Sequence, residues 1–336
     1  MLELPGAPDY GAEAPGADIL ATVPSDLRVY VDQEAEAQYV RQVARKIAQQ
    51  REHAAASEPL PPTFDGWDLI ANAKAIEPDI VEKLIPASGR LLIAGQAKAG
   101  KSSLALHVVA CLLDPRGRYL FGRYPVKSDP LRVYYIDAEL GHDRLALWLA
   151  NLDLPEWAVR GRLAASPLPS GASFNVFSPE NRAAWVERIR AHQTDVLLVD
   201  CASPILAAAG VDENSNSEVR AYLDQLNHLR IDAGARLLIL LHHQGKGGQA
   251  GPGSRGASAF LDFPEVLWSL SVEAEDDNYA EAPRFLRTRG RLGSHPGGML
   301  TWRQDGNVWG IEEGFTPARW RAEQKAARDA IGGRRW

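Results

Sequence analysis

Residues 95–102 read Gly-Gln-Ala-Lys-Ala-Gly-Lys-Ser and match the pattern G-x-x-x-x-G-K-[ST] at every required position. A short apolar run, Arg90–Ala94, precedes this stretch, and a run of helix formers, Ser103–Ala110, follows it. Glycines let the backbone approach an anion closely, and the N-terminus of the following helix faces that anion. The sequence therefore predicts a phosphate-binding loop between a strand and a helix, built for a nucleoside triphosphate.

Two residues at the end of this loop have distinct chemical roles. Lys101 can reach the β- and γ-phosphates as a point charge, and the hydroxyl of Ser102 can bind a Mg²⁺ ion that bridges them. The predicted nucleotide-binding residues are Gly95, Gln96, Ala97, Lys98, Ala99, Gly100, Lys101, Ser102 and Ser103.

Length and composition limit what else the chain can be. Its 336 residues are 45% hydrophobic, which suffices for one large domain with appendages. The net charge is −6, so any contact with DNA is expected to be local. The spacing of Cys111 and Cys201 indicates neither a zinc site nor a disulfide. With no apolar run long enough to span a bilayer and an acidic, Gly/Pro-rich start, we expect a cytoplasmic protein without a membrane partner.

Composition divides the chain into four segments. Residues 1–32 are rich in Pro and Gly and predict a disordered lead-in. Residues 33–62 hold an amphipathic helix and a Pro-rich linker, and the sequence leaves open whether that helix packs on its own domain or on a neighbouring subunit. Residues 63–312 are predicted to form the nucleotide-binding domain, and residues 313–336 a C-terminal helical tail.

After the linker, buried-strand patterns alternate with helical patterns, which predicts an α/β fold with a mainly parallel β-sheet flanked by helices. The buried-strand patterns cover Arg90–Ala94, Leu131–Asp137, Asp195–Asp200, Arg236–His242 and Pro264–Val272. Shorter strands separated by Gly-containing turns then predict antiparallel strands at one edge of the sheet. They cover Arg284–Arg291, Gly298–Arg303 and Asn307–Ile311.

Ligands bind at the carboxyl ends of parallel strands, and polar residues stand at three of these ends. Asp200 ends an apolar strand and is predicted to hold Mg²⁺ through its water shell. Asp137 and Glu139 end a second strand, and either carboxylate could polarise the attacking water. We favour Glu139 as the base because it lies just beyond the strand.

The third of these strands ends in two histidines, His242 and His243, ahead of a Gly-rich stretch. Successive strand residues point to opposite faces, so His242 is interpreted as a core residue. His243 is predicted to sense the γ-phosphate and to pass its presence to the Gly-rich stretch.

This order of motifs resembles the RecA-type ATPases. The motifs are the phosphate loop, Glu139, Asp200, then His242-His243-x-x-Lys246, and Ser254–Ser258. Within that class the chain is similar to the plasmid RepA-type hexameric replicative helicases and to phage RecA-like NTPases, over roughly residues 65–312. The resemblance implies a RecA-like fold, ATP and Mg²⁺ as cofactors, and self-association into a ring, with a hexamer expected. It also implies other proteins for loading and priming, such as a replication initiator or a primase.

The resemblance adds a pair of arginines and a DNA-binding centre. Arg287 and Arg289 share one face of a late strand and are predicted to reach the nucleotide of the adjacent subunit as arginine fingers; a solvated edge strand is the alternative. Single-stranded DNA is expected to contact Lys246 and Arg255 in the Gly-rich loop, and the loop at residues 204–217. Neither loop has aromatic residues, so the tryptophans are interpreted as packing residues.

The implied function is an ATP-hydrolysing, single-stranded-DNA-dependent motor, a DNA helicase acting in plasmid or phage DNA replication. Two alternatives share the same site. One is a recombination or repair ATPase that forms filaments, and the other is a nucleotide-switched helicase loader or regulator without processive unwinding.

Overall fold

The structure, a computed structural model, describes residues 62–73, 75, 77–243, 257–273, 282–291, 293–303 and 305–332. The chain forms two compact units, Met1–Ala75 and Ile76–Trp336. The smaller unit contains α3 (Gly66–Ala71), which begins after Asp65, whose carboxylate accepts hydrogen bonds from backbone N–H groups of its first turn. The predicted lead-in and N-terminal helix lie outside the described residues.

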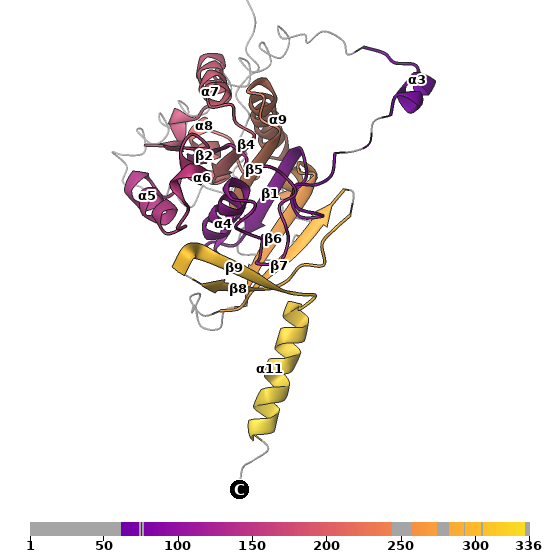
Figure 1. The fold of residues 1–336 in the computed structure, drawn as a ribbon, viewed down its shortest axis with the longest axis vertical. Coiled ribbons are helices and arrows are strands. Elements are labelled where there is room, and N and C mark those ends of the chain that lie inside the picture. Colours follow the sequence, from indigo (N-terminus) through magenta and orange to yellow (C-terminus); the bar gives the residue numbers. More distant parts are fainter. Residues whose placement is uncertain are drawn as a thin grey trace, which may run out of the picture. The chain divides into compact units, whose positions relative to one another are not determined.

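Among the described residues, one sheet of nine strands forms the framework of the larger unit, in the order β3-β2-β4-β5-β1-β6-β7-β8-β9 (Figure 1). The strands from β3 to β6 in this order are parallel, and β7, β8 and β9 are antiparallel. Their bounds are β1 (Gly89–Gly95), β2 (Val133–Asp137), β3 (Leu163–Pro167), β4 (Val196–Asp200), β5 (Leu237–His243), β6 (Val266–Val272), β7 (Arg284–Gly290), β8 (Gly298–Arg303) and β9 (Val308–Glu313). The predicted fold class is confirmed.

Helices cover both faces of this sheet. Leu91 and Ile93 of β1 pack in one core together with α4, and the alternate residues Leu92 and Ala94 pack in a second core together with α7, α8, α9 and α10. The helix bounds are α4 (Lys101–Leu113), α5 (His142–Ala150), α6 (Glu156–Val159), α7 (Pro179–Ala191), α8 (Ala202–Ala209), α9 (Asn216–Asp232), α10 (Ala257–Asp262) and α11 (Pro317–Gly332). Burial on both faces explains why the central strands are continuous apolar runs.

The register of the sheet brings the predicted polar strand ends to one level. In the pairing of β1 with β5, Gly95 lies opposite His243. In the pairing of β2 with β4, Asp137 lies opposite Asp200. The phosphate loop, the histidine and the carboxylates therefore share one edge of the sheet, as expected for parallel strands.

Two elements differ from the sequence-based expectation. The edge strand β3 was not predicted, because its sequence, Leu-Ala-Ala-Ser-Pro, has neither β-branched nor aromatic residues and is only partly buried. Residues 204–209, expected to begin a DNA-binding loop, belong to helix α8. Pro204 is compatible with this helix because it lies in the first turn, where its missing N–H group has no partner to lose.

None of the described helices is both long and apolar enough to cross a membrane.

Candidate nucleotide-binding site

A cavity of about 350 Å³ opens beside the phosphate loop. This volume lies within the range of small-molecule sites. The lining comes from the loop and α4, the segment after β2, the end of β5, and the antiparallel strands. It comprises Lys98, Gly100, Lys101, Ser102, Ser103, Leu106, Glu139, Leu140, Trp148, Asn151, His243, Arg284, Trp302, Asn307 and Trp309.

Gly100 is at the N-cap of α4 with φ +92°, a left-handed conformation that favours glycine. A Cβ atom at this position would also come 3.0 Å from the ring of Trp309. The second glycine of the loop is therefore required both by its backbone conformation and by a close neighbour.

Lys101, the first residue of α4, is buried and its side chain folds back over the loop. Its ammonium group donates hydrogen bonds to the carbonyl oxygens of Gly95, at 3.1 Å, and of Gln96, at 2.9 Å. A third contact, of 2.9 Å, joins Nζ to Nδ1 of His243. Burial lowers the pKa of Lys101, and the neighbouring carboxylate of Glu139 opposes that effect. The lysine thus has polar partners in the place that a phosphate would occupy.

His243 joins the lysine to the predicted base. An ammonium group only donates, so Nδ1 of the imidazole accepts from Lys101, and this tautomer has its N–H group at Nε2. Nε2 in turn lies 3.3 Å from Oε2 of Glu139, to which it donates. The structure therefore brings together three of the predicted residues in the order Lys101, His243, Glu139.

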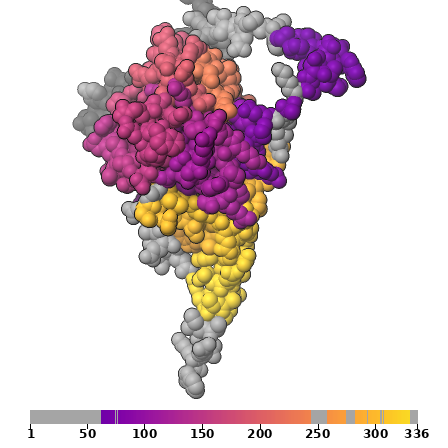
Figure 2. Space-filling view, in the orientation of Figure 1, coloured from indigo at the N-terminus to yellow at the C-terminus, as the bar shows by residue number. Residues whose placement is uncertain are grey.

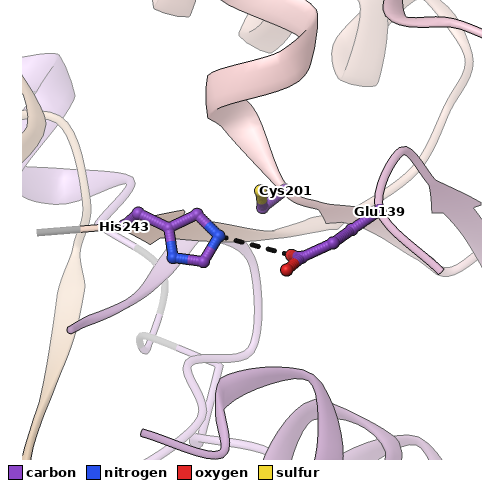
Figure 3. Close-up of side chains that lie close together, drawn as sticks. All are labelled: Glu139, Cys201 and His243. Atoms are coloured by element: carbon purple, nitrogen blue, oxygen red, sulfur yellow. Dashed lines mark hydrogen bonds and ion pairs between the residues drawn. The ribbon is translucent and has the colours of Figure 1, made fainter. Parts of the chain in front are cut away.

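Figure 3 shows the His243 ring turned toward Glu139, with Cys201 beside them. The Cys201 sulfur and the nearest donor atoms of the other two residues all lie within 4.8 Å of one another. The hydrogen bond from His243 lowers the pKa of Glu139, so this carboxylate is ionised at neutral pH. Burial raises the pKa of Cys201, which keeps the sulfur a neutral thiol.

Asp137, the other candidate base, has a structural position. Its buried carboxylate accepts hydrogen bonds from the backbone N–H groups of Glu139, Leu140 and Gly141, at 2.7 to 3.2 Å. These bonds close the turn between β2 and α5. Asp137 therefore orders the backbone that carries Glu139, while Glu139 itself lines the cavity.

Asp200 is fully buried at the end of β4. One of its oxygens, Oδ2, accepts a 2.6 Å hydrogen bond from the hydroxyl of Tyr135, a residue whose role the sequence did not predict. Burial raises the pKa of Asp200 to about 6, although the hydroxyls of Tyr135 and Ser102 oppose the shift.

The oxygens of Asp200 and Ser102 fit a Mg²⁺ ion. Oδ1 of Asp200 is buried and has no hydrogen-bond partner among the described residues. An orphaned carboxylate oxygen near a serine hydroxyl is a donor set that this cation prefers.

One wall of the cavity was missed by sequence reasoning. Trp302 and Trp309, on the hairpin of β8 and β9, and Trp148 of α5 line it, whereas the tryptophans had been interpreted as packing residues. Strand β9 contacts α4, and Figure 2 shows the yellow C-terminal residues directly against the purple part of the larger unit. No local motif marks this wall, because Trp302 and Trp309 lie about 200 positions after the loop.

Several predicted residues that the structure describes do not line the cavity. Arg287 and Arg289 are exposed on β7 and do not line it, whereas Arg284 of the same strand does. His242 stacks on Phe260, with ring centroids 3.7 Å apart, and burial lowers its pKa to about 4, as expected of a core position. Lys246 and Arg255 lie outside the described residues.

The fold and the loop together define an α/β domain with a phosphate-binding loop between β1 and α4. Residues 54–249 match the family described as an AAA domain. Because this match spans more than half of the chain, the protein belongs to that family.

The family match ends ahead of β6 to β9, so Trp302 and Trp309 lie beyond it, whereas Trp148 lies within it. Among solved structures, the chain is similar to the crystal structure of a KaiC-like protein from the hyperthermophilic archaeon Pyrococcus horikoshii OT3. The TM-score is 0.49 and the sequence identity 16%, with 71% of this chain and 98% of that chain covered. No curated protein matches the chain.

Proposed function

We propose that this protein hydrolyses ATP as a single-stranded-DNA-dependent motor, a ring-forming helicase of the kind used in plasmid or phage DNA replication. The observation that supports the catalytic part is the hydrogen-bonded series Lys101, His243, Glu139 beside the phosphate loop. It places a cation for the phosphates and an ionised base on the same side of one cavity.

The hydrolytic step assigned to Glu139 is the activation of water. Its carboxylate accepts a proton from, and orients, the water that attacks the γ-phosphate in line. The Nε2–H group of His243 fixes the direction of that carboxylate, since it donates to Oε2. The turn closed by Asp137 holds Glu139 at the cavity.

Nucleotide binding is proposed to rearrange Lys101. Its ammonium exchanges the carbonyl oxygens of Gly95 and Gln96, and Nδ1 of His243, for phosphate oxygens. His243 then loses the hydrogen bond that Lys101 donates to Nδ1, so binding of the triphosphate changes the hydrogen bonding of the imidazole. Ser102 and Asp200 would hold Mg²⁺, which supplies charge neutralisation on the phosphates.

The proposed dependence of hydrolysis on DNA is based on the position of His243 in the sequence. His243 is the last described residue of β5, and the segment with Lys246 and Arg255 follows it directly in the sequence. A phosphate backbone held by those two cations would act on the residue that contacts both Lys101 and Glu139. DNA binding and the orientation of the base are thereby coupled.

The proposal that the subunits form an oligomeric ring is based on Arg287 and Arg289. Both are exposed and do not line the cavity of their own subunit, and alternate residues on a strand share one face. In a closed ring they would reach the nucleotide of the adjacent subunit and stabilise charge in the transition state.

The test is steady-state ATP hydrolysis with and without single-stranded DNA, with Lys101→Ala as the blank. We expect DNA to stimulate hydrolysis, and Glu139→Gln to abolish it while leaving ATP binding intact. Stimulation should weaken as salt is raised, because the contacts are to phosphates.

A Lys101-dependent activity that ignores DNA at every salt concentration would overturn the motor proposal and favour the nucleotide-switched regulator. If DNA does stimulate, sizing separates ring from filament. A ring gives one oligomer size, and a filament lengthens with protein concentration.

A further inference from the structure

Trp302 is an exposed indole held in a fixed orientation at the cavity. Its exposed fraction is 42%, which is high for a large aromatic side chain, and it lines the cavity. Its Nε1–H group donates a 2.9 Å hydrogen bond to Oδ1 of Asn307. An aromatic face that is accessible and fixed by a hydrogen bond at its polar edge is suited to stacking against another planar ring.

Asn307 ties this indole to the phosphate-binding helix. Its Oδ1 also accepts from the hydroxyl of Ser103, and its Nδ2 donates to the carbonyl oxygen of Ser103 at 2.7 Å. Ser103 directly follows Ser102, so one buried amide connects the hairpin to the first turn of α4. The indole and the phosphate loop are therefore held at a set separation.

Trp309 lies beside Trp302 and next to the phosphate loop. It is 1% exposed, its ring lies next to Gly100 of the loop, and its centroid is 6.0 Å from that of Trp302 at an interplanar angle of 33°. Trp302 is thus adjacent to a buried ring that lies next to the loop.

We infer that Trp302 is the stacking platform for the base of the bound nucleotide, and that Asn307 is the residue that positions it. This inference rests on the proposed function, since it assumes that a nucleoside triphosphate occupies the phosphate loop. The ligand class is a purine nucleoside triphosphate, because the larger π face of a purine overlaps more of the indole than a pyrimidine does.

The experiment is equilibrium binding of ATP and of inorganic tripolyphosphate to the full chain, measured by calorimetry. Tripolyphosphate has the phosphates but no base. Trp302→Ala is expected to raise the Kd of ATP by about 5- to 150-fold, the range for loss of one base–aromatic stack. The Kd of tripolyphosphate should be unchanged, and Trp302→Phe should bind ATP nearly as the wild type does.

The matched control is Trp157→Ala. Trp157 of α6 is similarly exposed, at 56%, but does not line the cavity, so its removal should change neither Kd. For Asn307, a double-mutant cycle is the readout. If Asn307 acts by positioning Trp302, the Kd of ATP in the double variant Asn307→Ala/Trp302→Ala should rise by less than the product of the two single fold-changes.

Two results would overturn the inference. One is an unchanged Kd of ATP in Trp302→Ala. The other is an equal rise in both Kd values, which would mean that the substitution disturbs the phosphate loop. Failure of the proposed function gives a different result, namely wild-type protein that binds ATP but neither hydrolyses it nor responds to DNA.

Discussion

The hydroxyl of Tyr135, in the middle of β2, donates a 2.6 Å hydrogen bond to Oδ2 of Asp200, at the end of β4. The bond satisfies one oxygen of a buried carboxylate and leaves Oδ1 without a partner among the described residues. It also stabilises the ionised form of a group whose pKa burial raises to about 6. Tyr135 therefore affects the charge at the position proposed for Mg²⁺.

Tyr135→Phe should weaken Mg²⁺ binding mainly at low pH. Loss of a donor to the carboxylate raises its pKa further above about 6, by about 1 unit if the bond contributes about 1.5 kcal/mol. The ionised fraction of Asp200 then falls about fivefold at pH 6 and little at pH 8. Titrating the ATPase activity with Mg²⁺ at both pH values checks this, and an equal loss at both would refute it.

Asp200→Asn should stabilise the nucleotide-free protein while abolishing hydrolysis. The folded-state pKa of about 6 exceeds the ordinary value of 3.8 for an aspartate, so ionisation costs up to about 3 kcal/mol of folding free energy above pH 6. That cost disappears as the pH falls from about 6 toward 4. Urea unfolding without Mg²⁺ should show a gain in stability at pH 8 that shrinks at pH 5.

Asp137→Asn is the matched control, because it removes the same charge from the neighbouring strand end. Asp137 accepts three backbone hydrogen bonds with its two oxygens, and an amide can accept with one oxygen only. This variant should be destabilised by about 1 to 3 kcal/mol. If both variants were stabilised, or both destabilised, the different roles assigned to Asp200 and Asp137 would be contradicted.

His243→Ala should lower kcat by about 10- to 100-fold with a smaller effect on KM, since the imidazole orients the base. The hydrogen bond from His243 is the main cause of the lowered pKa of Glu139, so its loss raises that pKa. The acid limb of the kcat profile should therefore move to higher pH. His243→Gln, which keeps an N–H donor, should recover part of both effects, and a pH profile identical to wild type in His243→Ala would exclude the orienting role.

Mixing two inactive variants tests the arginine fingers. Lys101→Ala removes nucleotide binding from a subunit, and Arg287→Ala is expected to disable only the site of its neighbour. Mixed rings should regain activity at interfaces that pair one intact loop with one intact arginine, up to about a quarter of all sites in a random mixture. No recovery, or an active Arg287→Ala protein, would speak against Arg287 as a residue that acts between subunits.

The parts of the site that could be predicted from the sequence are those encoded locally. The phosphate loop lies within eight consecutive residues, and Glu139, Asp200 and His243 follow apolar strands whose ends must meet in a parallel sheet. The structure brings these together, as the spacing indicated. The chemical roles of these residues remain predictions.

The parts that could not be predicted depend on long-range contacts or on weak local signals. Asn307 meets Ser103 across 204 positions, and a single asparagine in a turn carries no sign of such a partner. Strand β3 is only partly buried, so its sequence lacks the apolar run that identified the central strands. Helix α8 includes residues 204–209, which were expected to begin a loop after Asp200; Pro204 is tolerated there because it lies in the first turn of the helix.

The long separation between Ser103 and Asn307 also bears on how the protein is made. A ribosome releases the phosphate loop, the base and the metal carboxylate well before the hairpin of β8 and β9. Until Asn307 has emerged, the first turn of α4 lacks its amide partner and the cavity lacks one wall. A nascent chain therefore carries the complete motif before it can form the complete cavity, which needs the hairpin of β8 and β9.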